Sequence, residues 1–152
     1  MLYTRKGDKG DTYFFGCNQR FSKSSELAEA LGALDEINSF LGLCKVRAQT
    51  HADFTQTNTD ITVMNFDIPA IIQIVQENLF IIQAALAGAA KKINQETILA
   101  AEKIIDEIEK ELPPIKTFFI SGGTELGALW TTAALLRGEQ SAALWLYPKK
   151  KK

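Results

Sequence analysis

The chain has few of the residues that bind metals or form disulfide bonds. It contains two cysteines, Cys17 and Cys44, and a single histidine, His51, in 152 residues. The two cysteines do not have the spacing of a metal-binding pair, so we do not expect a Cys/His zinc site or any other metal site made by the protein. Two free thiols are typical of the reducing cytosol, and we expect a cytoplasmic protein.

Long apolar runs and a basic surface are also missing. The N-terminus has no apolar signal-like region, and no run of 18 apolar residues occurs, so we expect neither export nor a membrane span. The net charge is −1, and four of the 17 cations are the lysines at 149–152. Without them the net charge would be −5, which argues against a nucleic-acid-binding surface.

What is present is the composition of an ordinary globular protein, with 46% hydrophobic and 23% charged residues. A chain of this length can bury a real core. We therefore expect one helical domain over residues 1–152, with a polar loop at 1–23 and a basic tail at 149–152.

Apolar residues recur at helical spacing in four segments, and we predict helices near 25–49, 68–90, 94–112 and 124–146. The first stripe is Leu27, Leu31, Leu34, Ile37, Leu41 and Cys44. The second segment is apolar on nearly every face and is expected to be buried against several neighbours. The third has an inward stripe that includes Ile98 and Ile105. Residues 50–66 have no period and are predicted to form a loop. With no convincing strand pairs, the fold class is all-α, an up-down bundle of four long helices.

The N-terminal segment has a different composition. Residues 4–12 read Thr-Arg-Lys-Gly-Asp-Lys-Gly-Asp-Thr, and Arg20 and Lys23 follow. Glycines let successive backbone N–H groups point at one anion, and lysine or arginine supplies the opposite charge. This pattern favours a polyphosphate-binding loop, and the alternative is a frayed, solvated terminus. No Gly-x-x-x-x-Gly-Lys-Ser/Thr motif occurs, and no strand-like run precedes the segment, so neither a P-loop nor a dinucleotide fold is indicated.

The segment at 4–12 resembles the N-terminal motif of the ATP:cob(I)alamin adenosyltransferases of the propanediol-utilisation type. Four further segments agree with that family in order and spacing, so that the resemblance covers about residues 2–137. They are Ser22-Lys23, the Glu-Ala-Leu-Gly-Ala-Leu-Asp-Glu-Ile-Asn-Ser run at 29–39, Gln76-x-x-Leu79-Phe80, and the stretch from Glu111-Leu112-Pro113-Pro114 to Gly122-Gly123.

The resemblance implies a trimer of helical bundles with active sites between subunits. Each site would bind ATP, with Mg²⁺ held mainly by phosphate oxygens, and a reduced corrinoid such as cob(I)alamin. The 5′-deoxyadenosyl group of ATP moves to cobalt, and triphosphate is released. Because cobalt(I) is itself the nucleophile, the protein needs no activated Ser, Cys or His. It must orient the substrates and stabilise the departing triphosphate.

The resemblance also implies the site residues. Phe118 takes the position of an aromatic side chain that covers the lower face of the corrin, and Asp35 that of an acidic residue paired with an arginine across the subunit interface. Arg137 completes the implied catalytic set. The implied ATP-binding residues are Thr4, Arg5, Lys6, Gly7, Asp8, Gly10, Thr12, Lys23, Arg137 and Glu139.

The C-terminal part departs from the family pattern. The family's fourth helix carries several arginines, and only Arg137 remains here, in the first or the second place of an arginine pair. In the second register Glu139 matches the family's glutamate. The family's fifth helix has no counterpart in the sequence. Two readings of the function therefore stay open. The chain is a working adenosyltransferase, or it is a catalytically impaired relative that acts as an ATP- or corrinoid-binding carrier or as a structural subunit.

Overall fold

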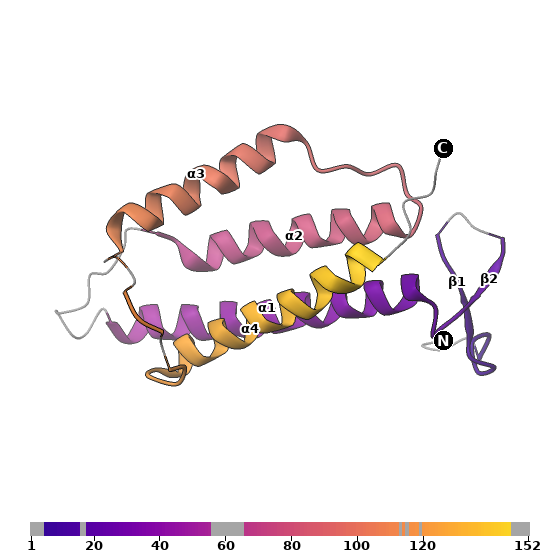
Figure 1. Ribbon diagram of the computed structural model, residues 1–152, viewed down its shortest axis with the longest axis horizontal. Coiled ribbons are helices and arrows are strands. Elements are labelled where there is room, and N and C mark those ends of the chain that lie inside the picture. Colours follow the sequence, from indigo (N-terminus) through magenta and orange to yellow (C-terminus); the bar gives the residue numbers. More distant parts are fainter. Residues whose placement is uncertain are drawn as a thin grey trace.

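The computed structural model describes residues 5–15, 18–55, 66–112, 114, 116–118 and 120–146, and for 51–55, 111 and 137–146 it describes the backbone alone. A short hairpin comes first, and four helices follow (Figure 1). In chain order the elements are β1 (Asp11–Tyr13), β2 (Arg20–Ser22), α1 (Glu26–Thr55), α2 (Ile68–Leu86), α3 (Gln95–Glu111) and α4 (Glu125–Leu146).

The all-α prediction is confirmed, and each of the four helices begins at a side chain that caps it; for α4 this is Thr124, whose Oγ1 accepts from the N–H of Gly127 at 3.0 Å. Ser25 Oγ accepts from the N–H of Ala28 at 3.3 Å at the start of α1. Asp67 caps α2 by accepting from the N–H of Ala70 at 3.0 Å. Asn94 caps α3, 2.7 Å from the N–H of Thr97. Each cap satisfies a backbone donor that the first turn leaves free.

Two predicted boundaries are wrong. Helix α1 continues to Thr55, so that residues 50–55 are helical rather than part of a loop. Thr50 lies within this extension, and its hydroxyl donates back to the carbonyl of Val46 at 2.7 Å. The polar residues at 50–55 show no clear helical periodicity, which is why a loop was predicted there. Such residues nevertheless do not end a helix that has already formed. Helix α2 ends earlier than predicted, at Leu86 instead of residue 90.

Helix α1 is central, because both α2 and α4 pack against it. The predicted stripe supplies the core, in which Ile37, Leu41 and Cys44 of α1 meet Ile72 of α2 and Ala133 of α4. Cys44 is completely buried, and this burial raises the pKa of its thiol. It therefore serves as a small apolar core residue rather than as a nucleophile.

The expectation that α2 is buried on most faces is wrong for the single chain. Only Ile72 and Gln83 of α2 are buried, and Phe80 is 62% exposed. Helix α3 lies along α2 in Figure 1, across an apolar groove of about 620 Å³. Ile98 and Ile105 of α3 line this groove as the inward stripe predicts, but they stay 41% and 62% exposed. The apolar faces of α2 and α3 exceed what one chain covers.

By length and composition α2 is the one helix in the described part of the chain that could cross a membrane. A single such helix is weak evidence for a membrane span, because core helices of globular proteins pass the same test. Gln76 and Gln83 of α2 both donate hydrogen bonds to α1. We therefore interpret α2 as a helix of the bundle.

Candidate functional site

The polar N-terminal segment is folded in the structure. Strands β1 and β2 pair antiparallel, with Thr12 opposite Phe21. A tight turn precedes β1, in which the N–H of Gly10 donates to the carbonyl of Gly7 at 3.2 Å. Gly10 has a φ of 82°, a conformation that glycine adopts without strain. The carbonyl of Gly10 then accepts from the N–H of Lys23 at 2.9 Å, which ties the turn to the start of α1.

Arg20 holds this loop closed. Its Nε and Nη2 donate to the two carboxylate oxygens of Asp11, and Nη2 also donates to the carbonyl of Lys6. Its guanidinium carbon lies 4.7 Å from the centre of the Tyr13 ring. The hydrogen bond from Arg20 lowers the pKa of the Asp11 carboxyl, and the same bond raises the pKa of Arg20. Arg20 is thus engaged by the loop itself.

From the sequence alone, Arg20 counts among the cations of the polyphosphate pattern, and its pairing with Asp11 was not predicted, although a signal was there. Arg20 lies opposite Tyr13 in the hairpin, and Asp11 is two residues from Tyr13 on the same strand. Residues so placed form a diagonal pair on one face of a two-stranded sheet. The signal could be used only once the hairpin register was known.

Lys23 and Gly7 are brought together directly. A Cβ atom added to Gly7 would lie 3.1 Å from Lys23 Nζ and 3.1 Å from the carbonyl oxygen of Asp11. The ammonium group therefore rests against the bare Cα of Gly7, and a larger residue would displace it. An anion-binding site typically combines a cationic side chain with a glycine-containing turn whose backbone N–H groups are accessible.

The other loop residues in the predicted ATP-binding set surround this contact. Arg5, Lys6, Asp8 and Gly10 are exposed, and Arg5 has a left-handed φ of 56°. Thr12 lies in β1, half-buried. Thr4 lies outside the described residues. The structure thus groups most of this set at one end of the molecule, next to the beginning of α1 (Figure 1).

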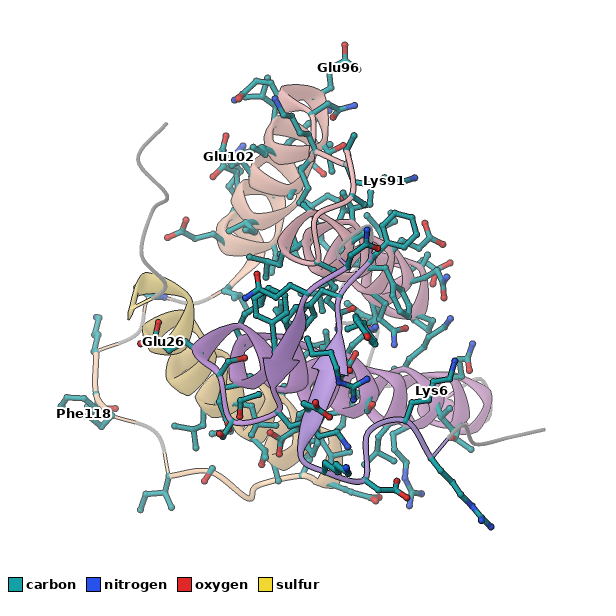
Figure 2. All side chains as sticks on the ribbon, turned by 90° about the vertical axis from the view of Figure 1, so that its right-hand side faces the viewer. Lys6, Glu26, Lys91, Glu96, Glu102 and Phe118 are labelled. Atoms are coloured by element: carbon teal, nitrogen blue, oxygen red, sulfur yellow. The ribbon has the colours of Figure 1, made fainter. Side chains whose placement is uncertain are left out.

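Phe118 lies far from this loop. Arg47 Nη2 is 3.3 Å from Glu125 Oε1, which places the beginning of α4 near the C-terminal half of α1. At 1.5 Å per residue, Arg47 is about 32 Å along α1 from Glu26, where α1 begins just after the hairpin. Phe118 precedes α4, is fully exposed and projects away from the helices in Figure 2. A single chain therefore does not bring Phe118 to the loop.

Arg137 and Glu139 are part of α4, which carries their backbone back along α1. Their side chains are outside the described part of the structure. The described residues contain no group of three or more His, Cys, Asp or Glu side chains that could hold a metal ion. A divalent cation at the loop would need other ligands, such as phosphate oxygens.

Asp35 is a solvent-exposed residue of α1 that lies at the edge of the contact with α2. Three polar contacts join the helices and show that they run antiparallel. They are Gln83 Nε2 to Asp35 Oδ1, Gln76 Nε2 to the carbonyl of Asn38, and Lys45 Nζ to Gln73 Oε1. Sequence reasoning missed Gln83, which lies 48 residues from Asp35. The available signal was two glutamines seven residues apart, on one face of an otherwise apolar helix.

Together, the fold and the loop define an all-α protein with a cationic, glycine-containing loop at one end. The sequence profile of the cobalamin adenosyltransferase family matches residues 2–138. The chain belongs to this family.

Curated relatives agree with this assignment. The corrinoid adenosyltransferase of Bacillus subtilis is 31% identical over 132 residues, which are 84% of this chain and 62% of the relative. The corrinoid adenosyltransferase PduO of Citrobacter freundii is 32% identical over 131 residues, 82% of this chain and 34% of the relative. The chain thus spans between about a third and two thirds of the length of these relatives.

Solved structures share the fold. One is a variant of the PduO-type ATP:corrinoid adenosyltransferase from Lactobacillus reuteri complexed with ATP, with a TM-score of 0.79 and 24% identity. The match covers 99% of this chain and 80% of that one. Another variant of the same protein, complexed with cobalamin and ATP, also has a TM-score of 0.79, at 23% identity, with 100% and 78% covered.

Proposed function

We propose that this chain transfers the 5′-deoxyadenosyl group of ATP to cob(I)alamin or a related reduced corrinoid. In this reaction cobalt(I) attacks the ribose C5′, the bond from C5′ to the triphosphate oxygen breaks, and triphosphate leaves. Membership of the family supports the proposal, as do relatives named as corrinoid adenosyltransferases. A related protein was solved with both cobalamin and ATP.

The observation that carries the proposal is the contact between Lys23 and Gly7. In our assignment the triphosphate lies on the 5–12 turn, where Lys23 Nζ and backbone N–H groups meet its charge. The Arg20–Asp11 pair keeps this turn in shape before ATP arrives, so little reorganisation is needed. Mg²⁺ would come with the ATP rather than be held by side chains of the loop, and it would supply part of the charge that stabilises the leaving triphosphate.

The separation of Phe118 from the loop supports a site shared between copies of the chain. We propose a homo-oligomer, most simply a trimer, in which the loop of one copy meets Phe118 and Arg137 of another. Phe118 would then cover one face of the corrin and keep an axial ligand off cobalt. The exposed apolar faces of α2 and α3 also favour assembly, because patches this large are uncommon on monomers. A cytoplasmic location remains part of this proposal.

The decisive experiment is anaerobic incubation of the protein with ATP, Mg²⁺ and chemically reduced cobalamin, followed by absorbance. Loss of the cobalt(I) spectrum, with formation of adenosylcobalamin and one triphosphate per turnover, is the expected result. A Lys23→Ala variant should be slower, and Lys9→Ala, in the same turn but outside the predicted ATP-binding set, is the matched control. Stable cob(I)alamin in the presence of ATP-saturated protein would refute the enzymatic function.

A second function is favoured by the sequence after residue 131, where only Arg137 remains of the several arginines in the fourth helix of the family. An impaired relative would bind ATP or corrinoid without joining them. Calorimetry that shows ATP binding, with no adenosylcobalamin formed, would identify this carrier role. Absence of binding to either ligand would leave a structural role.

A further inference from the structure

Gln83 has one bonded and one unbonded polar atom at a buried position. It is 9% exposed, and its Nε2 donates to Asp35 Oδ1. Its Oε1 is buried and finds no donor within the described residues, and the same is true of Asn38 Oδ1 on α1. Asn38 is 7% exposed. Both amides lie where α1 and α2 meet.

Asp35 dictates how the Gln83 amide is oriented. If the amide turned over, Oε1 would face the carboxylate oxygen of Asp35, and two acceptors would meet without a proton between them. The observed orientation avoids this repulsion and leaves Oε1 without a donor. A buried carbonyl in that condition is unfavourable, whereas an apolar side chain of the same length would leave nothing unsatisfied.

We infer that Gln83 is a positioning residue that fixes the carboxylate of Asp35 from within the same chain. The unbonded Oε1 of Gln83 lowers the stability of the fold, while its Nε2 binds one exposed carboxylate. The functional role of that carboxylate best explains why a glutamine occupies this position. The inference rests on the proposed function, because Asp35 belongs to the implied site. What the inference adds is Gln83 of α2, which gives Asp35 of α1 a hydrogen-bond partner from the same chain.

The first test replaces Gln83 by methionine, which has a similar shape and no hydrogen-bonding amide. We expect the melting temperature of Gln83→Met to stay equal to or rise above that of the wild type. We also expect kcat for adenosyl transfer to fall at least tenfold, with KM for ATP changed less than twofold. Gln76→Met is the matched control, because Gln76 is on the same face of α2 but bonds only a backbone carbonyl. It should leave kcat unchanged.

A purely structural glutamine predicts the opposite. Gln83→Met would then lower the melting temperature and leave kcat as it was, and either result overturns the inference. Equal losses of kcat in Gln83→Met and Gln76→Met would overturn it as well, because the seam as a whole would then be responsible. In an Asp35→Asn background, Gln83→Met should cause no further loss of kcat.

The second test uses charge and does not depend on catalysis. Gln83→Glu keeps the shape but sets two carboxylates at hydrogen-bonding distance, so one of them resists ionisation in the folded state. Its folded pKa is raised, so the variant should match the wild type near pH 4 to 5 and lose stability as the pH rises. At pH 8 we expect a melting temperature at least about 4 °C below that of the wild type.

Adding Asp35→Asn to Gln83→Glu should remove this pH-dependent deficit, because the amide introduced at position 35 can then donate to the carboxylate introduced at position 83. A deficit that is independent of pH, or that persists in the double variant, would show that Gln83 does not hold Asp35. If the wild type transfers no adenosyl group, the proposed function has failed. The stability measurements then still decide whether Gln83 fixes the Asp35 carboxylate.

Discussion

Removing the Lys23 side chain should weaken ATP binding without unfolding the loop. The ammonium group rests against the Cα of Gly7, whereas the backbone N–H of Lys23 makes the bond to Gly10 that ties the turn down. Lys23→Ala keeps that backbone bond and deletes only the charge. One charge-assisted contact contributes about 1.5 to 3 kcal/mol, and exposure of Lys23 to solvent places it at the low end. A loss of about 1 to 2 kcal/mol corresponds to a Kd roughly 5 to 30 times larger.

Isothermal titration calorimetry with MgATP at two salt concentrations measures this effect. The difference between wild type and Lys23→Ala should shrink at high salt, because mobile ions screen an exposed charge. Lys9→Ala is the matched control, since Lys9 is in the same turn but outside the predicted ATP-binding set. An unchanged Kd for Lys23→Ala, or an equal loss for Lys9→Ala, would refute the placement of the triphosphate.

Three further outcomes are expected. Phe118→Ala should slow adenosyl transfer but leave the melting temperature unchanged, because the Phe118 side chain is fully exposed. Ile120→Ala is the matched control for both measurements, since Ile120 is 98% exposed. Because Arg20 lowers the folded pKa of Asp11, the stability that this carboxylate lends the hairpin is present above pH 3.8, its ordinary value. It is lost as the pH falls below that value, so NMR should show the Lys23 amide losing its exchange protection there. Light scattering at micromolar concentration should give about three times the 16.8 kDa chain mass.

Each of these outcomes has a clear opposite. Equal slowing of transfer by Ile120→Ala would mean that any apolar truncation of this segment acts in the same way. An acid transition of the Lys23 amide that survives in Asp11→Asn would assign it to another carboxylate. A stable 16.8 kDa monomer with full activity would contradict the shared site.

Much of the fold was predictable because its signals are local. The stripe from Leu34 to Cys44 and the caps Asp67 and Asn94 act within one helix, and a helical period or a capping side chain is readable from neighbouring residues. The end of α1 was misplaced because continuation to Thr55 needs no signal, only the absence of a strong breaker.

The candidate site was predictable only in part. The glycines and cations of the N-terminal segment indicated an anion-binding loop by their chemistry alone. That prediction did not require knowledge of the hairpin. Whether the loop, Asp35 and Phe118 act on one substrate remains a prediction, because one chain keeps the loop and Phe118 at different ends of α1.

By itself, the sequence determined the helical class, most helix starts and the chemistry of the N-terminal loop, because each depends on residues close together in the chain. Only the tertiary structure decided which side chains became partners. Arg20 reaches Asp11 through the register of a hairpin, and Gln83 reaches Asp35 across two antiparallel helices. It also decided that Ile74, Val75 and Phe80 of α2 stay exposed in the single chain, since burial depends on which neighbours pack against a helix. Contacts between distant residues follow from packing, which no local pattern encodes.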